Sequence, residues 1–191
     1  LNKSKKTNFW TYLIEILQPH TRLGEVLTID KLISHYPSYE EPLFPMKSKY
    51  TFIVEKIYNW VLRLIGDAEP PIKRPEDKIR KMFNLMIDSE PVVRDEFFVT
   101  LIKCSRNNPR KESVEKVWQL LSLACGVILP SKELLPALYN YLILVVDNFP
   151  EERFKEWARY SLKRLFYLDK NKFERNFAPS NQEIFAARAR K

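Results

Sequence analysis

Apolar residues recur at spacings of three and four along most of the chain, whereas strict alternation of apolar and polar residues is nearly absent. Spacing of this kind places apolar side chains on one face of an α-helix, so the pattern predicts an all-α fold. The clearest stripe runs through residues 47–65 and is followed by Gly66, a residue typical of a helix C-terminal cap. We expect a long helix there.

Upstream of this helix the pattern is weaker. We predict a first helix over residues 8–17, which ends before a proline, and two short helical turns over 23–27 and 30–35. The stretch "YPSYEEPLFP" holds three prolines in ten residues, which predicts an extended connection. Leu43 and Phe44 are its expected anchors in the core.

Downstream, each predicted helix has a recognisable start. Acidic residues, a proline or a serine suit the first turns, because exposed amide groups there favour negative or hydrogen-bonding side chains. The "SNQE" sequence at 180–183 is a capping box, in which serine and glutamate satisfy each other's backbone amides. Gly126 is the expected C-terminal cap of the helix predicted over residues 113–125. The helices begin near residues 76, 93, 113, 131, 151 and 181.

The 191 residues are 45% hydrophobic, which is enough for one full core, and only three glycines occur against thirteen prolines. We therefore predict a single compact helical bundle of about six to nine helices. Residues 1–39 are expected to form a helical extension continuous with a domain over 40–191. Cys104 and Cys125 each lie inside an apolar helical pattern, which predicts buried free thiols and a reducing compartment.

The stretch "VRDEFFVTLIKCSRNNP" places charge next to core residues. In helical register Arg94 shares a stripe with Phe98 and Ile102, so we expect a structural buried charge that holds a second helix through a carboxylate or carbonyls. The alternative is that Arg94 extends its guanidinium to solvent. Asp95 and Glu96 are expected in the first turn, pointing outward, where unpaired amides favour carboxylates.

The formal net charge is +8 and the pI is near 9.4, which indicates an acidic partner surface. Two basic clusters are candidate partner-binding sites. The alternative for the second cluster is an ordinary solvated helix face, because Glu151 and Glu156 lie among its cations. Cations of the first cluster would also complement a helix C-terminus. The first cluster is Lys103, Arg106, Arg110 and Lys111, and the second is Lys155, Arg159, Lys163 and Arg164.

No constellation for catalysis is present in the sequence. His20 and His35 lack neighbouring metal ligands, and Asp95 and Glu96 diverge by about 100° on a helix, so they cannot act as a catalytic pair. We therefore expect no catalytic residue, metal or cofactor. Nucleic acid is not an expected partner, because the aromatic residues occupy inward positions. The longest apolar candidate, residues 134–146, is too short to span a bilayer.

Several stretches resemble the myosin tail homology 4 domain. They are "RDEFF", "LIKCSRNNP", "SVEKVWQLLSLACGVILPSKELLPALYNYL", "ARYSLKRL" and "APSNQEIFAARARK". Upstream, "EEPLF" and "LRLIGD" also resemble early segments of the family, which extends the likeness to about Glu40. The chain departs from the family pattern at Thr100, Cys104, Val117 and Leu129. The resemblance implies an all-α domain of the kind found in tails of unconventional myosins, a plant calmodulin-binding kinesin and some Rho GTPase-activating proteins. Such domains usually precede a FERM domain and bind microtubules or cargo tails.

Together these observations predict a non-catalytic interaction module from the tail of a cytoskeletal motor or a related multidomain protein. The expected partner is the acidic microtubule surface or a cargo protein, recognised through surface charge. The expected location is the cytoplasm, in association with the cytoskeleton. Two alternatives remain: a regulatory domain of a Rho GTPase-activating protein, and a purely structural brace for the neighbouring domain.

Overall fold

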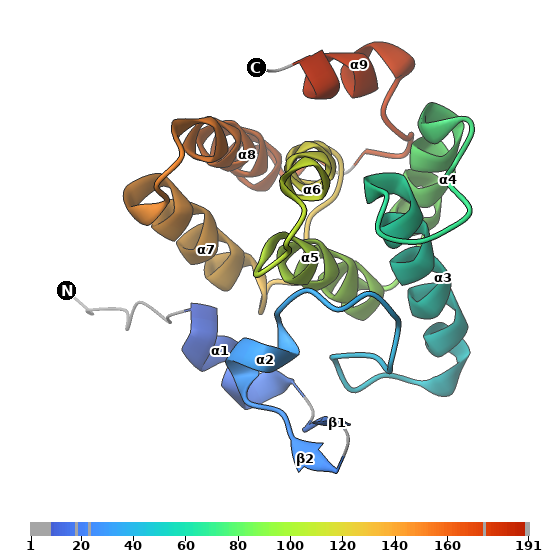
Figure 1. The fold of residues 1–191 in the computed structure, drawn as a ribbon. Coiled ribbons are helices and arrows are strands. Elements are labelled where there is room, and N and C mark those ends of the chain that lie inside the picture. The colour runs from blue at the N-terminus through green and yellow to red at the C-terminus, as the bar shows by residue number, and fades with distance from the viewer. Residues whose placement is uncertain (1–8, 18, 23, 174, 190–191) are drawn as a thin grey trace, which may run out of the picture.

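The computed structural model describes residues 9–17, 19–22, 24–173 and 175–189. Within these residues nine α-helices pack together in a bundle, and one pair of short antiparallel strands forms a small sheet (Figure 1). The prediction of an all-α fold with about six to nine helices is confirmed. The elements are α1 (Phe9–Ile16), β1 (Thr21–Arg22), β2 (Glu25–Val26), α2 (Ile29–Leu32), α3 (Ser48–Ile65), α4 (Pro75–Ile87), α5 (Pro91–Ser105), α6 (Lys111–Ala124), α7 (Leu135–Asn148), α8 (Glu152–Asn171) and α9 (Asn181–Ala189).

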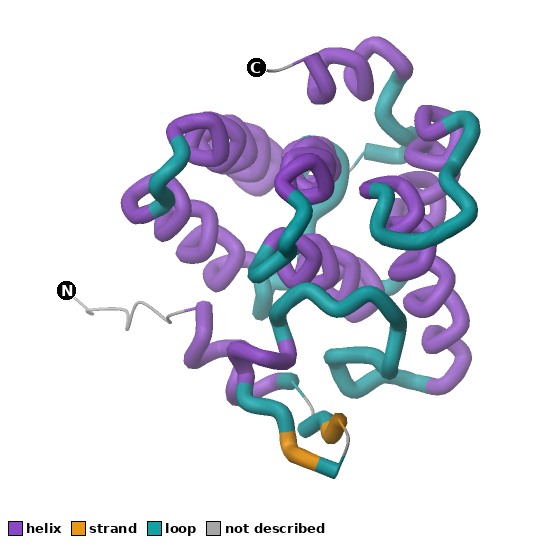
Figure 2. The backbone as a smooth tube through the Cα atoms, viewed as in Figure 1, coloured by secondary structure: helices purple, strands orange, loops and turns teal. Residues whose placement is uncertain are grey.

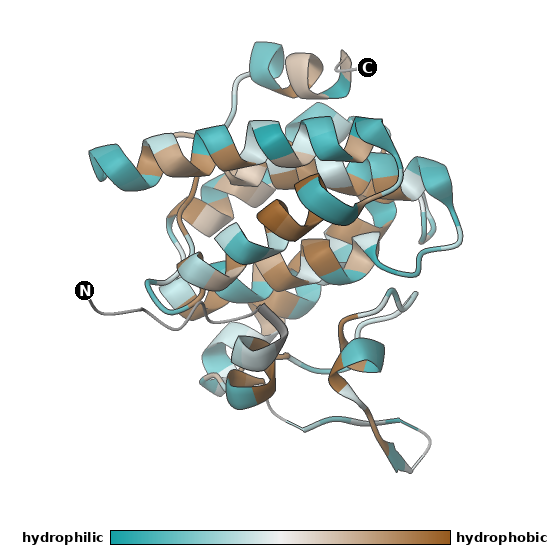
Figure 3. Cartoon of the chain, turned by 90° about the vertical axis from the view of Figure 1, so that its left-hand side faces the viewer, coloured by the Kyte–Doolittle hydropathy of each residue, from teal (hydrophilic) through white to brown (hydrophobic). Residues whose placement is uncertain are grey.

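Helix α6 lies at the centre of the bundle and is seen nearly end-on in Figure 1. It packs against α3, α5, α8 and α9, while α7 pairs with α8 on one side and α4 with α3 on the other. Trp118 on α6 and Trp157 on α8 are fully buried between these helices. In Figure 3 most helices carry apolar and polar residues side by side, as amphipathic helices do.

The segment between α2 and α3 runs as a long loop across the bundle (Figure 2). Leu43 and Phe44 are buried in it, which confirms their predicted role as anchors. The helical turn predicted over 23–27 is wrong, because Gly24 adopts φ 83° and reverses the chain between β1 and β2. The turn predicted over 30–35 corresponds to α2, which begins where the Thr28 hydroxyl accepts the Lys31 amide at 3.4 Å.

Two of the three predicted helix-end signals are confirmed. Gly66 ends α3 with φ 92°, and its amide donates to the Leu62 carbonyl at 3.0 Å. The capping box also forms: the Ser180 amide donates to Glu183 Oε2 at 2.9 Å, and the Glu183 amide donates to Ser180 Oγ at 3.2 Å.

The predicted cap at Gly126 is wrong. Helix α6 ends at Ala124, and its C-cap residue Cys125 has an ordinary right-handed conformation, so no glycine is needed to end the helix. Gly126 instead gives room to Arg164, because a Cβ atom there would lie 2.2 Å from the Arg164 Nε. The role of Gly126 therefore comes from a contact with the Arg164 side chain of another helix, which the local sequence does not show.

The prediction that Asp95 and Glu96 point outward from a first helical turn is wrong. Helix α5 begins at Pro91, which moves both carboxylates into the second turn, and both are buried. Glu96 is 2% exposed and accepts hydrogen bonds from the Leu43 amide at 2.9 Å and the Phe44 amide at 3.0 Å. The Asp95 carboxylate accepts the Ser131 amide at 2.7 Å. Both acids thus fasten distant loops to α5.

Arg94 was predicted to be the structural buried charge, with a carboxylate or carbonyl partner. Its side chain is half-buried, and its Nε is buried without a hydrogen-bond partner among the described residues. The fully enclosed charges are instead its neighbours Asp95 and Glu96 and, two turns later, Lys103. The fully buried charges near the start of α5 are thus Asp95 and Glu96, and the structural role expected of Arg94 stays a prediction.

Leu13 in α1 and Ile33 after α2 belong to the same hydrophobic core as the residues of α5 and α6. The amide of His35 also donates to the Arg106 carbonyl at 2.8 Å, which ties the N-terminal segment to the end of α5. Residues 1–8, part of the predicted extension, lie outside the described residues. The domain boundary at residue 40 stays a prediction.

Candidate partner-binding surface

Lys103 was predicted to be one cation of a partner-binding cluster, and its position contradicts that role. It is 4% exposed, and its Nζ lies 5.5 Å from the centre of the Tyr58 ring. Burial lowers the pKa of Lys103, while the nearby carboxylate of Glu40 opposes this effect. Because other elements cover α5 on almost every side, the Lys103 side chain is not accessible to a partner at the surface.

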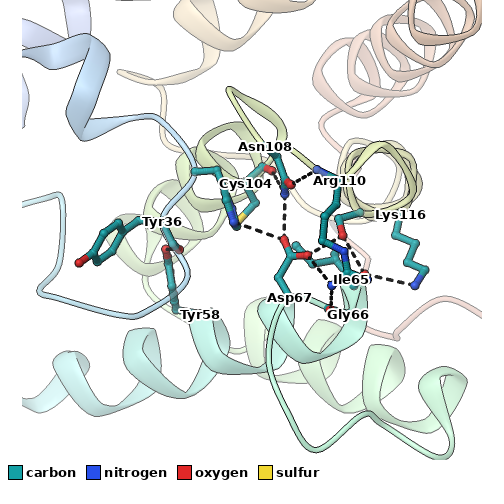
Figure 4. A network of polar contacts seen from close by, with 11 residues as sticks. Tyr36, Tyr58, Ile65, Gly66, Asp67, Cys104, Asn108, Arg110 and Lys116 are labelled. Atoms are coloured by element: carbon teal, nitrogen blue, oxygen red, sulfur yellow. Dashed lines mark hydrogen bonds and ion pairs between the residues drawn. The ribbon is translucent and has the colours of Figure 1, made fainter.

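Arg110 takes part in a polar network around the Asp67 carboxylate, drawn in Figure 4. That carboxylate accepts the Asn108 amide group at 2.8 Å and the Ser113 hydroxyl at 2.5 Å. Arg110 lies 3.5 Å from it and also donates to the Gly66 carbonyl. The Nε2 atom of His35 lies 3.5 Å away, and burial lowers the pKa of this imidazole. The network joins the α3 end to the α5–α6 loop.

Arg106 and Lys111, from the same predicted cluster, are also paired within the chain. Arg106 donates to Asp30 at 2.7 Å, and the Lys111 Nζ lies 3.3 Å from a carboxylate oxygen of Glu151. Ion pairs at such partly exposed positions contribute about 0 to 1 kcal/mol each. Their charges are nevertheless largely neutralised locally, which leaves less attraction for an acidic partner.

The predicted stripe on α8 is partly neutralised in the same way. Arg159 lies 2.6 Å from Glu152 and also pairs with Glu156, and Lys155 lies 3.9 Å from Glu152. The hydrogen bond from Arg159 holds the pKa of Glu152 below its usual range. Lys163 is exposed and makes no ion pair within the described part of the chain. It is the member of the stripe best placed to meet a partner.

Arg164, the last member of the second cluster, joins three helices. Its NH2 group donates to the Gly126 carbonyl at 3.2 Å and lies 3.7 Å from Glu183 at the start of α9. Its guanidinium also lies 5.7 Å from the Tyr160 ring centre. This arginine acts mainly as a brace between α6, α8 and α9.

A third group of basic residues, which the sequence did not indicate, lies on α3 and α4. We define the α3–α4 surface as Lys56, Trp60, Arg63, Lys78 and Lys81. The Nζ atoms of Lys56 and Lys78 lie 4.9 Å and 4.3 Å from the Trp60 ring centre, so two helices place cations on one indole. None of the four cations makes an ion pair among the residues that the structure describes.

The electrostatics of Lys78 reflect this crowding of charge. Burial lowers the pKa of Lys78, and the positive charges of Lys81, Arg63 and Lys56 lower it further. Phe52, one turn before Lys56, is 70% exposed and adds an apolar edge to the same face of α3. The sequence does not show this surface, because its cations come from two helices separated by a proline-rich loop. Only the packing of α3 against α4 brings them together.

The described residues hold no group of three or more histidine, cysteine, aspartate or glutamate side chains arranged for a metal ion. Cys104 and Cys125 are buried free thiols, as predicted, and burial raises the pKa of each to about 12. Such thiols are poor nucleophiles at neutral pH. No described helix has the length and apolar character that a bilayer span requires.

The family model for the MyTH4 domain matches residues 79–186, which is more than half of the chain. The chain belongs to the MyTH4 (myosin tail homology 4) domain family. The family predicted from the sequence is therefore confirmed, and with it the relation to myosin tails. The match covers α5 to α8 and most of α4 and α9, so it includes both predicted basic clusters.

Curated relatives of this MyTH4 domain are themselves myosins. Unconventional myosin-XVB of Homo sapiens is 25% identical over 126 residues, covering 65% of this chain and 4% of that protein. Myosin-VIIa of Drosophila melanogaster is 33% identical over 99 residues, covering 52% of this chain and 4% of that protein. The chain therefore spans a small fraction of the length of these relatives.

A solved structure of the human myosin 7b C-terminal MyTH4-FERM domain, in complex with the harmonin-a PDZ3 domain, has the same fold. The TM-score is 0.75 at 22% identity, over 93% of this chain and 34% of that one. The likeness extends to almost all of the chain, well beyond the part that the MyTH4 family model matches.

Proposed function

We propose that this MyTH4 domain is a non-catalytic interaction module of a motor tail, cytoplasmic and associated with the cytoskeleton. In this proposal it binds the acidic surface of a microtubule through its α3–α4 surface. The observation that carries the proposal is the group of four cations on the α3–α4 surface, two of them over the Trp60 ring, without carboxylate partners in the described chain. A cargo protein of similar acidity is the alternative partner.

Unpaired cations favour an acidic partner because their charge is not already compensated. A partner carboxylate near Lys78 would relieve the repulsion among Lys78, Lys81, Arg63 and Lys56. Trp60 and Phe52 add apolar area, and aromatic and arginine side chains are common at the energetic centres of interfaces. The α8 stripe offers mainly Lys163, so we assign it a secondary role.

The test is cosedimentation with microtubules over a series of salt concentrations. We expect binding to weaken as salt rises, because exposed charges separated by more than about 10 Å are largely screened at 0.1 M ionic strength. The double variant Lys56→Glu/Lys78→Glu should weaken binding by at least about tenfold, since like charge at an interface costs several kcal/mol. Circular dichroism should show an unchanged fold.

The matched control is Lys155→Glu/Lys163→Glu, which changes the net charge by the same amount on α8. We expect a smaller loss of binding from this pair. An equal or larger loss would return the site to the α8 stripe predicted from the sequence, and salt-independent binding would contradict recognition by charge altogether.

A second candidate role is a brace for the domain that follows, which we propose to be a FERM domain. Tyr167, Phe173 and Phe177 are exposed, yet they line one hollow at the end of α8, and the Arg175 guanidinium lies 4.4 Å from the Phe177 ring centre. Exposed apolar residues gathered in this way are typical of interaction sites. Both reported relatives are myosins, which favours a motor tail over a Rho GTPase-activating protein.

The brace is tested in the longer natural chain that includes the following domain. Calorimetry should show one melting transition if the two domains are coupled, and Phe173→Ser/Phe177→Ser should split it into two. Two transitions in the unaltered protein would exclude a rigid coupling.

A further inference from the structure

A small cavity of about 220 Å³ is lined by residues of α3, α4, α6 and α9. Figure 1 labels these four helices. Its walls are mostly aliphatic and come from all four helices and from the loop before α4. Charged and polar side chains, Arg63, Lys116, Arg188 and Gln119, complete the lining. The aliphatic residues are Leu64, Ile72, Ile79, Leu120, Leu123 and Ile184.

The size of the cavity limits what it can hold. Sites for cofactors and comparable small molecules usually enclose about 300 to 1,000 Å³, so 220 Å³ is small for such a ligand. A single leucine or phenylalanine side chain is of suitable size. The aliphatic walls would then remove that side chain from water, which is the main favourable contribution to such a contact.

Two cations beside the cavity are held in place by the backbone. The Arg63 Nε donates to the Pro70 carbonyl at 2.7 Å, and the Lys116 Nζ donates to the Ile65 carbonyl at 3.2 Å. Neither cation is within ion-pair distance of a carboxylate in the part of the chain described here. Carbonyl bonds orient these side chains but leave their positive charge uncompensated.

The third cation differs from these two. Arg188 on α9 pairs with Glu76 at the start of α4, so its charge is largely neutralised and it closes one side of the cavity. The arrangement is therefore an apolar hole flanked by two uncompensated positive charges. Its complement is a bulky apolar side chain flanked by carboxylates.

We propose that this cavity receives one bulky apolar side chain of an acidic peptide segment in the partner protein. The inference rests on the proposed function, because Arg63 belongs both to the α3–α4 surface and to the cavity lining. It adds a specific anchor to an otherwise electrostatic interaction. The partner segment is thus defined by pattern: acidic residues on both sides of one phenylalanine, leucine or similar residue.

The experiment measures fluorescence anisotropy of short labelled peptides with the intact chain. One peptide has a central phenylalanine between glutamates, a second has serine at the centre, and a third has lysines in place of the glutamates. We expect the phenylalanine peptide to bind about ten- to one-hundred-fold more tightly than the serine peptide. The lysine peptide should not bind.

Two variants of Gln119, which lines the cavity from α6, test the location. Gln119→Trp should fill the cavity and abolish the preference for phenylalanine over serine. Gln119→Glu keeps the size but adds a negative charge, and it should weaken both acidic peptides. Gln182→Trp, on an exposed position of α9 outside the lining, is the matched control and should bind as the unaltered chain does.

Equal affinity for the phenylalanine and serine peptides, or a preference that survives Gln119→Trp in a folded protein, would overturn the inference. A different outcome would contradict the proposed microtubule binding. If Lys56→Glu/Lys78→Glu leaves microtubule binding unchanged while the anchor preference persists, the cavity stands as a peptide site and the microtubule proposal falls. If microtubule binding depends on the α3–α4 surface but no anchor preference is found, only the cavity inference falls.

Discussion

The substitution Glu96→Gln gives a direct measure of the cost of burying a carboxylate inside the bundle. Glu96 is enclosed on α5 and accepts the amides of Leu43 and Phe44. Burial raises the pKa of Glu96 from 4.5 to about 7, although these two hydrogen bonds and the charge of Lys103 oppose the rise. Glutamine has nearly the same shape and does not titrate.

The magnitude follows from linkage between protonation and folding. Between pH 4.5 and about 7 the folded state keeps a proton that the unfolded state releases, so the free energy of unfolding falls as pH rises. At 1.36 kcal/mol for each pKa unit, the fall over this window is about 3 kcal/mol. The Gln variant lacks this contribution. The difference in stability, variant minus wild type, should therefore shift in favour of the variant by about 2 to 3 kcal/mol from pH 5 to pH 8.

The variant also has a cost that does not depend on pH. Its amide NH2 group faces a backbone N–H where a carboxylate oxygen stood, which costs about 1 to 3 kcal/mol. This cost cancels when stabilities at two pH values are compared. Asp95, whose pKa burial raises to about 6, titrates in both proteins, so only its repulsion with Glu96 differs between them.

Urea unfolding followed by tryptophan fluorescence at several pH values supplies the measurement, with linear extrapolation to water. Glu55→Gln, at an exposed position of α3, is the control for loss of a carboxyl group at the surface. Parallel pH profiles for wild type and Glu96→Gln would refute the reasoning, because they would show that the two amides fully compensate for burial.

Three further substitutions test other contacts. Gly126→Ala should destabilise the fold by less than about 1 kcal/mol, since its Cβ would displace only the flexible end of Arg164, and an Arg164→Ala background should remove most of that loss in thermal melts. Trp118→Ala should cost about 3 to 5 kcal/mol in urea unfolding, because the ring is fully buried. Arg175 lowers the pKa of Glu183 to about 2, so its contribution is present above pH 4.5 and lost as pH falls towards 2. Glu183→Gln should cost roughly 1 kcal/mol at pH 7, with the gap closing in acid.

The sequence predicted the helices well where one face of each meets the core. In α3 the apolar stripe and Gly66 together define the element, and both signals are local. The capping box at Ser180 and Glu183 is local too, which is why it was predicted correctly. The stretches that resemble the myosin tail homology 4 family extended the prediction of an all-α fold to the whole domain.

The errors arise where tertiary contacts decide the environment. Asp95, Glu96 and Lys103 lie on a helix that is covered on nearly every side, so helical register alone could not identify an outward face. The groups that satisfy Glu96 come from a loop more than fifty residues away in sequence. Gly126 was read as a cap because its role depends on Arg164, a residue of another helix.

The candidate site was predicted less well than the fold, for a related reason. A count of cations along the sequence does not show which of them face carboxylates from other elements, as Arg106 faces Asp30. Lys56 and Lys78 come together only when α3 and α4 pack, on either side of Trp60. A surface of this kind depends on interhelical geometry, which periodicity does not report.

The hydrogen bonds that Glu96 accepts determine how far the N-terminus of this protein can be truncated. The family match starts at residue 79, but the amides that Glu96 holds belong to Leu43 and Phe44. A recombinant fragment trimmed to the matched residues would expose that carboxylate and the apolar side of α5 that α3 covers. Such a fragment should aggregate, whereas one that retains the long loop and α3 should stay monodisperse.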